Sequence, residues 1–144
     1  MANQDAAFGF RPIGKVGQNR DNQGLSEYNI AASASAIFQN DPVQFLATGT
    51  IGVANTTTAV LLGSLNGVFY TDATDQKPRW ANHLAAANAA TDIVGFVSDD
   101  PYERFEVQSS TTLAIADIGL NADIVYAAGS SPNFVSKTEV DTTS

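Results

Sequence analysis

The sequence predicts an all-β protein, a single small sandwich or barrel domain with at most short helical turns. Short apolar and β-branched runs follow one another from Leu25 onward. Turn signals separate these runs about every 8–12 residues, a spacing typical of sandwiches and barrels. The chain has 144 residues and no repeat of fixed period, so its length fits one domain.

The first 24 residues differ from the rest and predict an extended N-terminal arm. Glycine, proline and polar residues interrupt this stretch, and no period of 2 or 3.6 persists in it. Phe8 and Phe10 lie two positions apart, so they share one face of an extended backbone. These aromatic rings, followed by Arg11 and Pro12, favour an arm ordered against a partner over a disordered terminus. The expected division is 1–24 for the arm and 25–144 for the β domain.

Strands and turns are expected to alternate through the first half of the domain. Asn40-Asp41-Pro42 is a turn signal, because Asp can cap its own backbone and Pro fixes φ. Asn66-Gly67 predicts a hairpin, since both residues tolerate positive φ. Strands are expected at residues 28–30, 34–38, 43–47, 51–53, 57–62 and 68–71.

The stretch 72–90 is the least regular part of the sequence. Lys77-Pro78 interrupts any helix, and residues 81–90 fit either two helical turns or a loop. Alternating apolar residues then resume. Further strands are expected at residues 93–97, 105–107, 113–115, 124–126 and 133–140.

Composition excludes several classes of function. Fifteen Asp or Glu against seven Lys or Arg give a net charge of -8, which opposes binding to nucleic-acid phosphates. The apolar runs are too short to span a bilayer, and the first residues lack a secretory signal. The chain has no Cys, hence no disulfide or thiolate metal site. Neither a nucleic acid nor a membrane is an expected partner.

The sequence offers little for catalysis. His83 is the only histidine, and no second metal ligand lies at helical spacing from it. Asp72 and Asp75 could bind a hard cation, but Lys77 lies beside them, so a solvated acidic turn is the better interpretation. No catalytic residue, cofactor or metal is expected.

Aromatic residues are the remaining candidates for recognition. Trp80 follows Pro78-Arg79 in the irregular stretch, with Tyr70 and His83 nearby in the sequence. These three residues are the candidate surface-recognition loop. A sugar platform would expose Trp80 and Tyr70 beside polar groups, whereas the alternative places such rings at the end of a barrel or in a subunit interface.

Several short phrases stand in a characteristic order over roughly residues 7 to 126. They are Ala7–Ile13, Asn40–Val43 with Thr48-Gly49, Leu62-Gly63, Gly67–Asp72, Lys77-Pro78 with Trp80 and Asn82, Phe96–Pro101, Phe105–Gln108 and Asp117–Asn121. No single phrase is diagnostic, but in their order and spacing they resemble the head-decoration, or capsid-cement, structural proteins of tailed bacteriophages. One departure is His83-Leu84-Ala85-Ala86-Ala87, where relatives have a stretch rich in aromatic residues, Pro and Gly.

The resemblance implies a β-barrel or β-tulip domain that attaches to the outer surface of an expanded capsid, often as a homotrimer. Its partners would be the major capsid protein and further copies of the chain, made in the bacterial cytoplasm and assembled on the virion. Phe8, Phe10, Arg11 and Pro12 would be contact residues of the arm. The alternatives are a carbohydrate-binding module or head-fibre base contacting host glycans, and a tail or neck structural protein.

Overall fold

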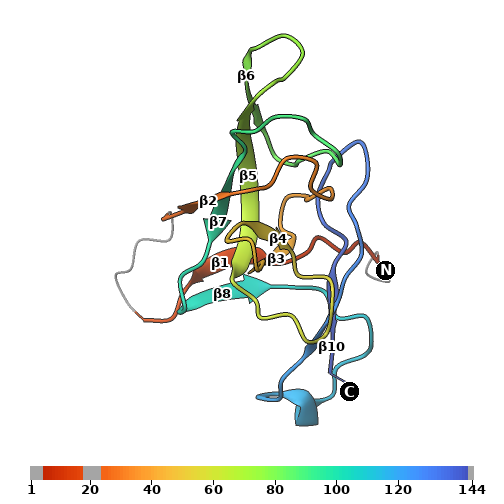
Figure 1. The fold of residues 1–144 in the computed structure, drawn as a ribbon. Coiled ribbons are helices and arrows are strands. Elements are labelled where there is room, and N and C mark those ends of the chain that lie inside the picture. Colours follow the sequence, from red (N-terminus) through yellow and green to blue (C-terminus); the bar gives the residue numbers. More distant parts are fainter. Residues whose placement is uncertain (1–4, 18–23, 143–144) are drawn as a thin grey trace.

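A computed structural model describes residues 5–17 and 24–142 (Figure 1). Nearly all of the regular structure in these residues is β, which confirms the predicted all-β class. A single 3-10 turn, η1 (Ile115–Asp117), is the only helical element that they contain.

The main sheet has six strands, all antiparallel to their neighbours. β5, at its centre, pairs with β7 on one side, and with β3 and β6 at its two ends. β2 and β4 are the outer strands. The six are β2 (Ser26–Asn29), β3 (Pro42–Phe45), β4 (Ile51–Val53), β5 (Gly63–Thr71), β6 (Pro78–Ala81) and β7 (Val94–Ser98).

Two small sheets accompany the main one. β1 (Arg11–Lys15) pairs with β8 (Glu103–Glu106), and β9 (Asp123–Val125) pairs with β10 (Glu139–Asp141). The sheets do not close into a barrel, so that part of the prediction is wrong. The outer strands β2 and β4 have only four and three residues, and an isolated bridge between Ile30 and Ile51 joins them. One bridge is too short a ladder to close a barrel.

The core lies against one face of the main sheet. Its buried members come from the sheet and from the loops that cover it, and Leu84 shows how a loop contributes. The Leu84 N–H donates to the Ile37 carbonyl at 2.7 Å, and the Ile37 N–H donates back at 3.0 Å. The stretch after β6 is therefore a loop, not a helix, and it covers the core. The buried cluster is Ile30, Ile37, Val43, Ile51, Leu65, Val68, Leu84, Ala90, Ile93 and Val97.

Several predictions of local structure are wrong. Residues 34–38 form no strand, only an isolated bridge at Ile37, and of residues 133–140 only the last two belong to a strand, β10. Asn66-Gly67 lies inside β5 at a register shift, because partners on both sides of β5 hold it extended. Residues 57–62 form no strand, and 113–115 lead into η1. β6 was not expected, since Pro78 and Asn82 are poor strand signals.

The predicted arm is also partly wrong. Phe10 is 7% exposed and packs edge-on against Phe105, with 6.0 Å between ring centroids. Its N–H donates to the Asn40 carbonyl at 2.8 Å. Residues 9–15 are therefore part of the folded domain, because β1 pairs with β8. Residues 1–4 and 18–23 of the predicted arm lie outside the described residues.

Candidate interaction surfaces

Three aromatic rings form a platform on the side of the main sheet that faces away from the core. Phe69 of β5 lies opposite Trp80 of β6, and Phe96 of β7 lies opposite Gly67. Because Gly67 has no side chain, the Trp80 ring reaches across β5 to Phe96, with 5.3 Å between centroids and 20° between planes. Phe69 lies 4.8 Å from Trp80. Trp80 still has 69% of its surface exposed. These three residues are the aromatic platform.

The other two residues of the predicted recognition loop lie elsewhere. Tyr70 follows Phe69, so it points to the opposite face of the strand, and it packs against the core. The His83 ring is stacked between two aromatic rings. Its centroid lies 3.9 Å from that of Phe134 and 6.1 Å from that of Phe38. Burial lowers the pKa of His83. The structure therefore does not bring Tyr70, Trp80 and His83 together.

The residues predicted to be contact residues of the arm interact with other residues of the same chain. The Arg11 guanidinium lies 4.9 Å from the centre of the Phe8 ring and pairs with Glu106. Pro12 lies opposite Phe105 in the β1–β8 ladder. These contacts fix the segment before β1 to the domain.

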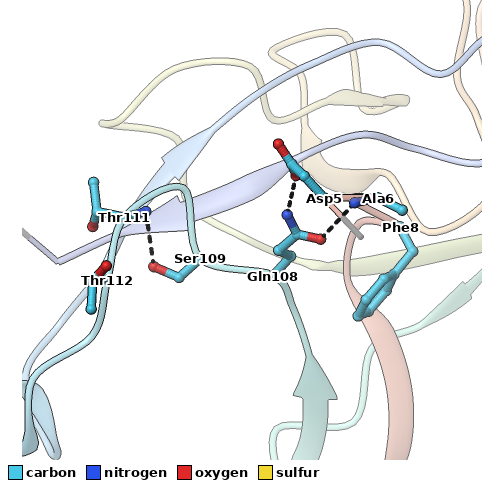
Figure 2. A pocket seen from close by; sticks show the side chains of 7 residues that line it. All are labelled: Asp5, Ala6, Phe8, Gln108, Ser109, Thr111 and Thr112. Carbon is cyan, nitrogen blue, oxygen red and sulfur yellow. Dashed lines mark hydrogen bonds between the residues drawn. The ribbon is translucent and has the colours of Figure 1, made fainter. Parts of the chain in front are cut away.

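A wide, open hollow lies beside Phe8, and Figure 2 shows Gln108 bonded to the segment that contains Asp5 and Ala6. The Gln108 Oε1 accepts a hydrogen bond from the Ala6 N–H at 3.3 Å, and its Nε2 donates to the Asp5 carboxylate. Both ends of this amide therefore hold the N-terminal segment.

The acidic turn near the tip of the β5–β6 hairpin contains Asp72 and Asp75, and both carboxylates pair with Arg79. Arg79 Nη2 lies 2.8 Å from Asp75 Oδ2, and Arg79 Nε lies 3.6 Å from Asp72 Oδ2. Asp72 also accepts a hydrogen bond from the Thr74 N–H at 2.8 Å, which lowers its pKa. The described residues contain no group of three or more His, Asp or Glu that could hold a metal.

A second surface has no charged side chain of its own, and the half-buried Asp99 lies at its edge, where its carboxylate accepts from the hydroxyl of Tyr28, whose ring packs against Phe45. Residues 28–71 include one charged residue, Asp41, and Asp41 is buried. Two hollows of about 400 and 290 Å³ flank β3 and β4, and Gln44 lines both. Large apolar side chains are exposed around the smaller hollow, and Val60 is 83% exposed. We call this surface the neutral face; its apolar residues are Phe45, Leu46, Val60, Leu61 and Leu62.

The third surface is an ordered turn, residues 113–120, at the lower end of the molecule in Figure 1. Its apolar side chains point outward, with Ile115 89% and Ile118 81% exposed, and Leu113 and Leu120 also exposed. Hydrogen bonds hold its backbone. Asp117 Oδ2 accepts from the Ala114 N–H at 2.7 Å, and the Asp117 carbonyl accepts from the Leu120 N–H at 3.1 Å. We call these residues the apolar turn.

One carboxylate, that of Asp41, is buried inside the folded domain. Asp41 is 0% exposed; its Oδ2 accepts from the Phe38 N–H at 2.8 Å, while its Oδ1 has no hydrogen-bond partner. Burial raises the pKa of Asp41 to about 6, and the polar Ser136 side chain nearby partly opposes the rise. The Ser136 hydroxyl donates to Thr138 Oγ1 at 3.0 Å. We call Gly9, Asn40, Asp41, Ser136 and Thr138 the polar junction.

Comparison with known proteins found no match for this chain among family profiles, curated proteins or solved structures. The described residues include no helix that is long and apolar enough to cross a membrane. The neutral face was not predicted from the sequence. Its signal there is the long interval 28–71, in which Asp41 is the one charged residue.

Proposed function

We propose that the protein is a non-enzymatic attachment protein that binds the outer surface of a tailed-phage capsid and stabilises it. The observation that carries the proposal is the exposure of two apolar surfaces on ordered backbone, the neutral face and the apolar turn, which fit contacts between proteins in a repeating lattice, those between neighbouring copies included. Large exposed apolar patches usually mark sites of protein interaction.

Charge supports the same proposal. The central part of a protein interface is depleted of charged residues, as the neutral face is. The remainder of the chain is acidic, and a net charge of -8 keeps such a protein away from packaged DNA. The choice of a capsid as partner comes from the resemblance of the ordered phrases between residues 7 and 126.

The test is co-sedimentation of the full-length protein with expanded capsids that lack it. We expect saturable binding and a higher temperature of capsid disruption, because each attached copy adds contacts across the lattice. Capsids that are already fully decorated are the control, since their sites are occupied. If the protein never sediments with undecorated capsids, the proposal fails.

A second candidate function is glycan binding by the aromatic platform. The observation that favours it is the exposure of Trp80 above Phe69 and Phe96, since an exposed aromatic ring can stack against the apolar face of a sugar. Tyr70 takes no part in it, because it lies on the other face of β5. Binding on a glycan array that is lost in Trp80→Ala would support this function, and an array without any signal would exclude it.

A further inference from the structure

We propose that copies of this chain associate head to tail, with the apolar turn of one copy seated on the neutral face of the next. The inference deepens the proposed function by naming the surfaces through which copies would meet. It rests on contacts that need no capsid, so it can be tested on the isolated protein. A closed ring of three copies would be the homotrimer that the resemblance implies.

Charge selects these two surfaces. Each copy carries a net charge of -8, so most approaches of two copies bring acidic groups together. Screening acts over about 8 Å at physiological ionic strength, and charges in a close contact therefore still repel. The neutral face has no exposed charged residue. Residues 107–122 have one, Asp117, whose carboxylate is held by the Ala114 N–H. Repulsion is smallest where these surfaces meet.

Shape matches the turn to the neutral face. Ile115 and Ile118 project from a turn that its own hydrogen bonds hold in place. The neutral face offers a hollow of about 290 Å³ lined mainly by apolar side chains. A preordered protrusion loses little conformational entropy when it is seated, which favours binding. The lining residues are Gln44, Phe45, Thr58, Val60, Leu61 and Leu62.

The contact must form between molecules. Ile115 is 89% and Val60 83% exposed in the same chain, so the turn does not cover its own neutral face. If one turn-to-face contact joins each pair of copies, the contact is heterologous, and its repetition gives a closed ring or an open chain. If two copies exchange their turns reciprocally, the result is a closed two-fold dimer. The experiment distinguishes this turn-to-face arrangement from two others. In one, two neutral faces contact each other; in the other, the surfaces bind a partner of another kind.

The first measurement is sedimentation equilibrium of the isolated protein from about 1 to 200 µM, a range that covers weak association. We expect an average mass above the monomer mass of 15.1 kDa that rises with concentration to a multiple of it. A monomer throughout this range would overturn the inference.

The second measurement uses two variants with the same charge at highly exposed positions, Ile118→Lys in the turn and Val60→Lys on the neutral face. Each is expected to weaken association at least about tenfold, because a charge would be buried in an apolar contact. Val16→Lys is the matched control; Val16 is 56% exposed and lies outside both surfaces. Melting temperatures within a few degrees of the unmodified protein verify that each variant is folded.

Mixing the two variants tests the head-to-tail arrangement itself. The Val60→Lys chain keeps its turn and the Ile118→Lys chain keeps its neutral face. The mixture should form a 1:1 dimer that grows no further, because its other contact would bring two lysines together. If only Val60→Lys weakens association and the mixture forms no dimer, two neutral faces meet each other and the inference is wrong. If both variants associate like the unmodified protein, other surfaces are used and it is also wrong.

Capsid binding, measured in parallel, keeps the two proposals separate. Association of the isolated protein without binding to capsids would overturn the proposed function alone. Capsid binding by a protein that stays monomeric in solution and occupies isolated sites would overturn this inference alone.

Discussion

The polar junction and the apolar turn place their side chains in opposite ways, although each contains a glycine of positive φ. At the junction, Gly9 has a φ of +71°, and Asp41, Ser136 and Thr138 are buried. In the turn, Gly119 has a φ of +88°, and the large apolar side chains are exposed. Polar groups lie inside at one site, and apolar groups lie outside at the other.

The difference follows from where the backbone finds its hydrogen bonds. At the junction, segments far apart in the sequence meet outside the named strands. Side chains supply partners there in addition to backbone bonds such as that from the Phe10 N–H to the Asn40 carbonyl. The Ser64 hydroxyl, for example, donates to the Phe10 carbonyl at 2.6 Å. In the turn, local bonds such as that from the Leu120 N–H to the Asp117 carbonyl hold the backbone. Its side chains are then available for contacts, so we expect the junction to control stability and the turn to control association.

The largest expected effect is that of Gly9→Ala. A Cβ at Gly9 would lie 2.4 Å from the Asn40 carbonyl oxygen and 2.5 Å from the Ser136 Cβ, in a backbone conformation that already strains an alanine. The clash and the strain together should lower the free energy of unfolding by about 3 kcal/mol or more. Chemical denaturation measures the change.

Gly119→Ala is the matched control in the turn. A Cβ there meets no atom within 4 Å, so only the strain of positive φ remains. We expect a loss of about 1–2 kcal/mol. Equal losses at the two glycines would contradict the contrast between junction and turn.

The second prediction concerns the pH dependence of stability at Asp41. Its pKa is raised from 3.8 to about 6 in the folded protein, so the folded state holds the proton more tightly than the unfolded chain. The contribution of this group to stability is therefore complete below about pH 4 and is lost as the pH rises through about 6. The difference amounts to about 3 kcal/mol at most.

Asp41→Asn isolates this contribution, since Asn cannot titrate and its oxygen can still accept from the Phe38 N–H. Denaturation of both proteins at pH 4 and pH 7 should show a smaller gain at low pH for the variant. Identical pH profiles would mean that Asp41 titrates in the folded protein as it does in the unfolded chain.

Ser136→Ala should have an intermediate effect. The Thr138 N–H would lose its acceptor, the Ser136 hydroxyl at 3.1 Å, and an unpaired buried N–H costs about 1–3 kcal/mol. Loss of the polar Ser136 hydroxyl near Asp41 should also raise the pKa of Asp41 further. NMR titration of the Asp41 carboxyl carbon measures the second effect. Ser110→Ala, at an exposed serine, is the control and should change neither quantity.

Ile115→Ser is expected to have the smallest effect on stability. Because Ile115 is 89% exposed, the free energy of unfolding should change by less than about 0.5 kcal/mol. The same substitution should weaken self-association, as sedimentation equilibrium can show. A large loss of stability without any change in association would mean that the turn supports the fold and not the contact between copies.

Strands with strong local patterns were predictable. The Asn40-Asp41-Pro42 signal precedes β3, and the apolar run 93–97 overlaps β7. Trp80, a residue of the predicted recognition loop, is exposed. Its companions on the platform, Phe69 and Phe96, come from strands whose order a single sequence does not provide. Phe10 was misassigned to an arm, because its partner Phe105 is distant in the sequence.

The sequence by itself determined the all-β class, the acidic balance and the long interval, residues 28–71, in which Asp41 is the one charged residue. These properties follow from composition and local periodicity, which need no long-range contact. Only the tertiary structure decided that Asn66-Gly67 stays extended within β5, that the sheets remain open, and that Asp41 is buried while Ile115 is not. Each of these depends on pairing and packing between distant segments, whose hydrogen bonds and burial outweigh local preference.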